Sequence, residues 1–97
     1  MDAFCYIIHS QQLAKFYIGV TQDDVHNRLI QHNTASYGSN HFTARAKDWN
    51  LFLTIQVSTF DHAVRLERKI KAMKSTNYIR NLKKYPELKL KIITQTA

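Results

Sequence analysis

Two β-type runs open the chain, and a third lies near its middle. The first runs from Phe4 to His9 and the second from Lys15 to Thr21. Both are rich in the aromatic and β-branched residues that favour strands. Because only the short segment 10–14 joins them, they are predicted to pair as an antiparallel hairpin. A third strand is predicted from Leu51 to Ser58, where Leu51, Leu53, Ile55 and Val57 alternate with Phe52, Thr54 and Gln56.

Apolar residues spaced three and four apart predict helices between and after these strands. The first helix follows a segment, 21–24, that offers several capping side chains, and its inward residues are Val25, Leu29 and His32. Asp61 is the predicted cap of the second helix. Its buried stripe is predicted to hold Ala63, Leu66, Ile70 and Met73.

A third helix is predicted from Thr76 to Lys84, with Ile79 and Leu82 turned inward and an end before Pro86. The segment from Leu88 to Ile93 is expected to form a short extended tail. Residues 34–50 are polar and irregular. A loop of this length is uncommon in a small domain unless it has a function.

The resulting order, β-β-α-β-α-α, predicts an α/β fold with a three-stranded, mainly antiparallel sheet flanked by helices. At 97 residues and 44% hydrophobic composition, the chain is expected to form a single domain, 1–97. One cysteine can neither staple the fold nor build a cysteine-based zinc site. The five histidines lack metal-ligand spacing, and there is no glycine-rich phosphate loop. We find neither a secretory signal nor a membrane-length apolar run, so a cytoplasmic protein without a membrane partner is expected.

Positive charge is concentrated in the last third of the chain. The sequence holds 14 basic and 7 acidic residues, a net charge of +7. Ten of the basic residues lie between positions 65 and 91, with only Glu67 and Glu87 to offset them, whereas the first 64 residues are close to neutral. Such a distribution attracts polyanions, and nucleic acid is the commonest one in cells. A solvated helix surface is the alternative explanation of the same charges.

Five side chains could carry chemistry once these elements are drawn. Arg28 and His32 are one turn apart and share a helix face that borders the apolar stripe, and Glu67 lies at the margin of the second helix's stripe. The others are the strand tyrosines Tyr6 and Tyr17. Considered singly, each has a structural explanation: core tyrosines, a surface Arg and His pair, and a glutamate paired with a neighbouring base.

Taken together, the order of these residues resembles the GIY-YIG nuclease family. Tyr17-Ile18-Gly19 is the second of the family's two strand triplets, and Phe4-Cys5-Tyr6 stands where Gly-Ile-Tyr is usual. An Arg and a His one turn apart follow, within Asn27 to Asn33. The segment Leu66 to Lys71 is similar to the helix that carries the family's metal-binding glutamate. Phe42 to Trp49 occupies the place of a basic loop that ends in Trp in small members.

The resemblance implies a metal-dependent endonuclease that hydrolyses phosphodiester bonds in DNA, with a role in repair or recombination. Glu67 is then expected to bind one divalent cation, Mg²⁺ or Mn²⁺. Arg28 is expected to neutralise charge on the phosphoryl oxygens. The general base is left open among Tyr6, Tyr17 and His32, of which a histidine matches neutral pH better than a free tyrosine.

Other residues are expected to support binding. The predicted nucleic-acid contacts are Arg45, Lys47, Arg68, Lys71 and Lys74. The family commonly places an Asn after the metal-binding glutamate; Asn77 and Asn81 are both downstream, and spacing does not choose between them. Selectivity for a substrate is expected to be weak or to come from a protein partner.

Two alternatives to the nuclease hypothesis remain. One is a nucleic-acid-binding module of the same fold that cuts poorly or not at all. The other is a structural or protein-interaction domain, which leaves the uneven charge and the five side chains as coincidences.

Overall fold

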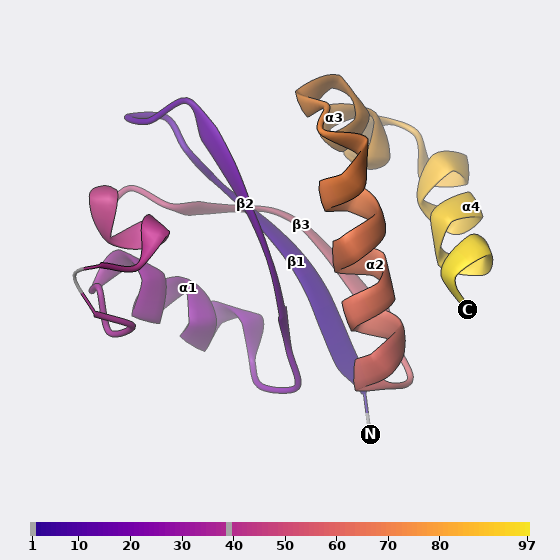
Figure 1. Ribbon diagram of the computed structural model, residues 1–97, viewed down its shortest axis with the longest axis horizontal. Helices are drawn as coiled ribbons and strands as arrows, with labels where there is room; N and C mark the ends of the chain where they lie inside the picture. Colours follow the sequence, from indigo (N-terminus) through magenta and orange to yellow (C-terminus); the bar gives the residue numbers. More distant parts are fainter. Residues whose placement is uncertain (1, 39) are drawn as a thin grey trace.

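The three predicted strands form one antiparallel sheet with the order β2-β1-β3 (Figure 1). The computed structural model describes residues 2–38 and 40–97. The central strand β1 (Ala3–Ser10) pairs with β2 (Lys15–Thr21) through a tight turn and with β3 (Asn50–Val57) on its other side. The predicted hairpin and fold class are therefore confirmed.

Helices cover both faces of the sheet. The helix α1 (Val25–Asn33) begins at Asp24, whose side chain accepts a hydrogen bond from the His26 amide. It lies against one face, together with a short 3-10 helix, Phe42–Arg45. The helices α2 (Phe60–Met73), α3 (Thr76–Lys84) and α4 (Pro86–Thr96) gather on the other face (Figure 1). None of the helices in residues 2–38 and 40–97 is long and apolar enough to cross a membrane.

The second helix differs from the prediction at both ends. Its cap is Thr59, whose hydroxyl accepts a hydrogen bond from the His62 amide at 3.1 Å, whereas Asp61 lies in the first turn. At the other end Met73 is 43% exposed, although its spacing placed it in the buried stripe. The chain leaves the helix at Lys74, where φ is +49°, and the last turn extends past the core.

The predicted extended tail is wrong, because residues 86–96 form α4. Pro86 occupies the start of this helix. Amides in the first turn have no acceptor within the helix, so the missing N–H of proline costs no hydrogen bond there, and its fixed φ is compatible with helical structure. Leu88 and Ile92 are one turn apart, and both pack against the core. The proline therefore ends one helix and begins the next.

The sheet divides the interior into two cores, because alternate residues of β1 point to opposite faces. Ala3, Cys5 and Ile7 pack under α2, α3 and α4 in a wholly apolar cluster. Tyr6 and Ile8 face α1. The buried Cys5 thiol has its pKa raised to about 12, chiefly by burial, as is typical of a structural rather than a reactive cysteine.

A β-bulge corrects the predicted faces of β3. The pairing with β1 shifts between Ile7 and Ile8, so Leu53 lies opposite Ile7 while Leu51 lies opposite Ile8. Two residues predicted to share a face therefore lie on opposite faces, Leu53 in the apolar core and Leu51 under α1. Phe52 is the extra residue, and it also packs against the apolar core.

Candidate active site

The two tyrosines of the triplets share the sheet face that α1 covers. In the β1–β2 register Tyr6 is paired with Gly19, and Ile8 with Tyr17, which places both tyrosines on that face. A Cβ atom added to Gly19 would lie 2.5 Å from the Tyr6 Cζ and hydroxyl atoms. Glycine is therefore required at position 19, because the Tyr6 ring lies directly over its backbone.

His32 connects Tyr6 to the long loop. Its Nε2 atom is 2.8 Å from the Tyr6 hydroxyl, and its Nδ1 atom is 2.8 Å from the Thr43 hydroxyl. The Thr43 hydroxyl is in turn 2.9 Å from Nδ1 of His41. His32 is 2% exposed, so its imidazole is held between two hydroxyl groups inside the protein.

Burial, with smaller electrostatic contributions from the neighbouring His41 and Arg28, lowers the pKa of His32 to about 4. The imidazole is therefore neutral at pH 7, with one donor nitrogen and one acceptor nitrogen. The Thr43 amide donates a hydrogen bond to Nδ1 of His41 at 3.3 Å, so Nδ1 of His41 carries no hydrogen. The same nitrogen can therefore also accept a hydrogen bond from the Thr43 hydroxyl. The Thr43 oxygen then accepts a hydrogen bond from Nδ1 of His32. The other ring nitrogen of His32, Nε2, is left to accept a hydrogen bond from the Tyr6 hydroxyl.

Arg28 is held in a fixed orientation beside these groups. Its Nε atom donates to the Thr21 hydroxyl at 3.0 Å, and Nη1 donates to the Tyr37 hydroxyl at 2.9 Å and to Gln31 at 3.3 Å. The hydrogen bond to Tyr37 is the main cause of the raised pKa of the guanidinium. A guanidinium has five N–H donors, so donors remain for an anionic ligand.

Glu67 approaches the same place from the opposite face of the sheet. It belongs to α2, which packs against the apolar face, but the pocket it lines also contains Gly19 and Val20 of the edge strand β2. One carboxylate oxygen is 3.4 Å from Nζ of Lys71, and the Glu67 side chain is 20% exposed. Its negative charge contributes to raising the pKa of Tyr17, after burial. The predicted position at the margin of the stripe is thus confirmed.

All five predicted site residues line one pocket of about 230 Å³, at the free edge of β2. Tyr6 and Tyr17 come from strands, Arg28 and His32 from α1, and Glu67 from α2. The structure therefore brings the whole set together. The remaining lining residues are Gly19, Val20, Tyr37 and His41.

A comparison with protein families matches residues 2–84 to the GIY-YIG catalytic domain. The chain belongs to the GIY-YIG family. The comparisons with curated proteins and with solved structures find no match. GIY-YIG domains are nucleases that typically use divalent metals, so the family assigns this chain a nuclease-type function and nucleic acid as its substrate.

The long loop supplies site residues of this GIY-YIG domain that the sequence did not single out. Tyr37 and His41 line the pocket, and Thr43 joins the two histidines. Trp49 anchors the loop: its indole donates to the Thr43 carbonyl at 2.8 Å, and its amide donates to Asn33 at 2.7 Å. The only sequence signal was the length of the loop, because its polar residues follow no period.

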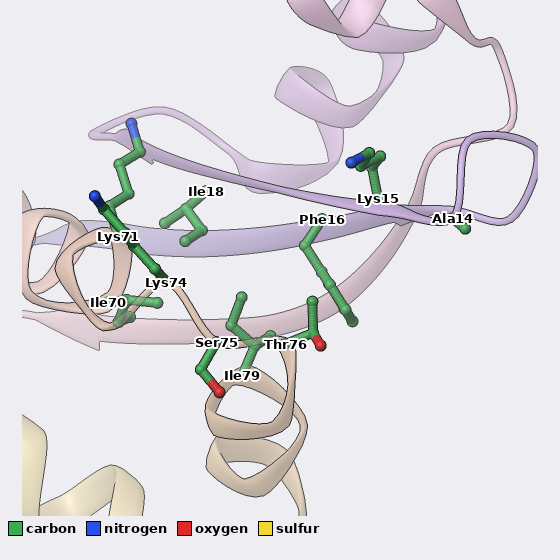
Figure 2. Close-up of a pocket in the computed structure, with 10 residues that line it drawn as sticks. All are labelled: Ala14, Lys15, Phe16, Ile18, Ile70, Lys71, Lys74, Ser75, Thr76 and Ile79. Atoms are coloured by element: carbon green, nitrogen blue, oxygen red, sulfur yellow. The ribbon is translucent and has the colours of Figure 1, made fainter.

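The predicted binding residues lie outside this pocket. Arg45, Lys47 and Arg68 are exposed and do not line it. The same is true of the two asparagines considered for a supporting role, Asn77 and Asn81, on α3. Lys71 and Lys74 line a second pocket on the α2 side of β2 (Figure 2).

The donor set around Glu67 fits a weakly held magnesium ion. Among residues 2–38 and 40–97, no group of three or more His, Cys, Asp or Glu side chains could hold a metal by itself. Magnesium is commonly bound through one or two carboxylates and keeps its other positions for waters and substrate phosphates. A single carboxylate in an open polar pocket satisfies that requirement, and Glu67 is the residue that would supply it.

Proposed function

We propose that this GIY-YIG domain is a metal-dependent endonuclease that hydrolyses phosphodiester bonds in DNA. The observation that supports the proposal is the convergence of Tyr6, Tyr17, Arg28, His32 and Glu67 on one pocket. These side chains come from both strands of the hairpin and from helices on opposite faces of the sheet. A purely structural role does not require an arginine, a neutral histidine and a carboxylate to meet at one edge.

Tyr6 and His32 are assigned to the attacking water. The raised pKa of Tyr6, caused mainly by burial, keeps its hydroxyl protonated at pH 7, and His32 Nε2 is the acceptor of that proton. As water attacks phosphorus, its proton moves to the Tyr6 oxygen while the Tyr6 proton moves to His32. A new phosphorus–oxygen bond forms and the bond to the leaving sugar oxygen breaks. Tyr17 would position the phosphate, since no partner for its hydroxyl is found in the described residues.

Arg28 is assigned to the charge that builds on the phosphoryl oxygens. Its guanidinium is always protonated, and Thr21, Gln31 and Tyr37 fix its plane before substrate binds. A donor that is already oriented costs little reorganisation when charge develops, which is the usual source of electrostatic catalysis.

Glu67 is assigned to the metal. A divalent cation bound there would polarise the scissile phosphate and offset the charge by which Glu67 raises the pKa of both tyrosines. Glu67 is paired with Lys71. That pair would have to open for Glu67 to bind a cation.

The basic residues between 65 and 91 are assigned to the DNA backbone. Contacts to phosphates fix the position of a protein on DNA but carry no direct sequence information. Selectivity among DNA sequences is therefore expected to be weak, and a partner protein would supply the choice of substrate.

A cleavage assay tests the proposal. The chain is incubated with Mg²⁺ or Mn²⁺ and with supercoiled, single-stranded or branched DNA, the last being the kind that repair and recombination produce. We expect cleavage that Arg28→Ala reduces by at least about a hundredfold, since loss of one transition-state donor costs this much. Glu67→Gln is expected to have an effect of at least about the same size, because it removes the carboxylate that would hold the metal. Glu87→Gln is the matched control, because Glu87 is exposed at the start of α4.

The binding-only alternative predicts a different outcome. The Glu67–Lys71 ion pair favours it, because the carboxylate that would hold the cation already has a positively charged partner at 3.4 Å. DNA binding without cleavage, under every metal and substrate condition, would overturn the nuclease proposal and support a binding module. Cleavage that survives both site substitutions would show that the assigned pocket is wrong.

A further inference from the structure

A second pocket lies beside the candidate active site on the other face of β2. It has a volume of about 320 Å³ and is formed where β2, the end of α2 and the start of α3 meet (Figure 2). Its floor is apolar: Ile18, Ile70 and Ile79 are each at most 7% exposed. The half-buried Phe16 ring contributes a wall. The volume is at the lower end of the range for small-molecule sites, which suits a group the size of one nucleobase.

Three lysines line the pocket, of which Lys71 and Lys74 stand on its own side of β2, at the last turn and cap of α2. The Lys15 side chain projects from the other side of the strand (Figure 2). All three are exposed, and no carboxylate is among the described residues that line the pocket. A cavity with an apolar base and a cationic rim complements a ligand whose flat apolar part lies between anionic groups. A nucleotide within a strand has this form.

Lys71 joins the pocket to the site of the proposed reaction. It lines the pocket and also forms the ion pair with Glu67 at 3.4 Å. Lys74 is seven residues beyond Glu67, which is about 10 Å along a helix. That distance spans about three steps of a nucleic-acid strand. A strand with its scissile phosphate at Glu67 would therefore reach this pocket within about three nucleotides.

We propose that the pocket is a nucleotide subsite, in which one unpaired base of the substrate strand packs against Ile18, Ile70 and Ile79 while Lys71 and Lys74 bind the flanking phosphates. The inference rests on the proposed function, because it assumes that the strand bound in this pocket also reaches Glu67. It adds a substrate preference: a strand with an unpaired base near the cut is bound more tightly than a fully paired duplex. An acidic peptide would satisfy the lysines but not the flat apolar floor.

Isoleucine methyl groups report directly on this pocket. The chain, labelled at isoleucine methyls and kept free of divalent metal, is titrated with the tetranucleotide dA4 and followed by NMR. We expect the methyl signals of Ile70 and Ile79 to shift, because a purine ring placed on them changes their local field. Ile8 is buried under α1 on the opposite face and serves as the internal reference, so its methyl signals are expected not to shift.

Three comparisons make the test specific. A tetramer with the same phosphates but no bases is expected to bind at least about fivefold more weakly and to leave both methyl signals unmoved, since one stacked base contributes this much. Lys74→Gln is expected to weaken dA4 binding more than Lys84→Gln, which removes the same charge from an exposed site outside the pocket. A tetraglutamate peptide is expected to leave the signals unmoved.

The outcomes separate this inference from the nuclease proposal. Equal shifts with dA4, the base-free tetramer and the peptide would overturn the subsite and indicate a general anion surface. If the chain cleaves DNA but dA4 does not shift the Ile70 and Ile79 signals, the subsite is overturned and the nuclease proposal stands. Shifts with dA4 in a chain that cleaves no DNA would support the subsite and overturn the nuclease.

Discussion

The two faces of the sheet are built from one set of strands but differ in chemistry. Under α2, α3 and α4 the buried residues are chiefly apolar, with Leu66, Ile70 and Leu82 among them, and the buried Thr96 hydroxyl is hydrogen-bonded to His62. Under α1 the buried residues include His32 and Thr43, joined to Tyr6 by hydrogen bonds. The first arrangement gains stability by removing apolar area from water. The second buries polar groups, which is favourable only while every partner is present.

This difference indicates how the fold supports a reactive site. A polar network contributes little net stability, so the apolar face must hold the sheet in place. Gly19 and the free edge of β2 then let Glu67 reach the polar side from the apolar side. The two faces should therefore respond differently to substitution: changes in the apolar face should lower stability without changing cleavage per folded molecule, whereas changes in the polar face should also change cleavage.

Leu82→Ala should produce the largest loss of stability. Leu82 is 1% exposed in the apolar cluster, and truncating a buried leucine costs about 2–5 kcal/mol. Chemical denaturation measures the loss, with Leu90→Ala as control because Leu90 is 63% exposed. The cleavage rate per folded molecule should stay unchanged. A lower rate at full folding would mean that the two faces are not separate.

Acid should destabilise the polar face through His32. Its pKa is about 4 in the folded protein against 6.5 when free. The unfolded chain therefore binds the additional proton first, and stability falls as pH decreases from 6.5 to 4, by up to about 3 kcal/mol. His32→Gln should flatten the dependence of unfolding free energy on pH in this window. His26→Gln, an exposed site on the same helix, should leave it unchanged.

The same histidine sets a prediction for catalysis. If His32 must be neutral to accept the Tyr6 proton, the acid limb of kcat/KM should follow its pKa and lie well below pH 6.5. A pH profile of single-turnover cleavage measures this limb. An acid limb at 6.5 or above would show that another group receives the proton.

Gly19→Ala should reduce cleavage more than stability. The added Cβ would be 2.5 Å from Tyr6, and the ring must move. Overpacking of this kind costs about 1–3 kcal/mol, but a displaced hydroxyl loses its contact with His32. We expect cleavage to fall at least about tenfold, since small misplacements in a reacting geometry have effects of this size or larger. Gly38→Ala is the control for backbone strain without a clash: φ is +100° there, but no heavy atom lies within 4 Å of the added Cβ. It should lower stability and leave cleavage per folded molecule unchanged.

Two threonines provide the smallest and closest comparison. Thr43→Val removes the hydroxyl between His32 and His41 and should cost about 1–3 kcal/mol, because buried partners lose a hydrogen bond. Thr54→Val should be neutral or stabilising, because the buried Thr54 hydroxyl has no hydrogen-bond partner in the described residues. Thermal unfolding of both variants measures the difference. Equal losses would contradict the role of Thr43 in the network.

Much of the fold could be predicted from the sequence because each element carries a local pattern. Apolar residues alternate in the strands and recur every three to four residues in α1 and α2, and these patterns predict the elements. The fold class follows from the order of the elements. The bulge at Phe52 was missed because it depends on pairing with β1. The tail was missed because Pro86 was treated as an end, although Leu88 and Ile92 have helical spacing.

The site was predicted only in part, for a similar reason. Tyr6 and Glu67 were found through the family resemblance, and their convergence depends on a strand edge that no local pattern shows. Tyr37, His41 and Thr43 lie in a loop with no period. Their positions depend on the burial of Trp49 and on hydrogen bonds between residues distant in sequence.

The central claim is that Tyr6 and His32 act as one unit in cleavage, and a double-mutant cycle tests it most directly. Single-turnover cleavage rates are measured for the unmodified chain, Tyr6→Phe, His32→Gln and the double variant, with folding of each checked by thermal unfolding. If the proton passes from Tyr6 to His32, the double variant should cleave no more slowly than the slower single variant. If the two losses instead multiply, the residues act independently and the proposed proton path is wrong.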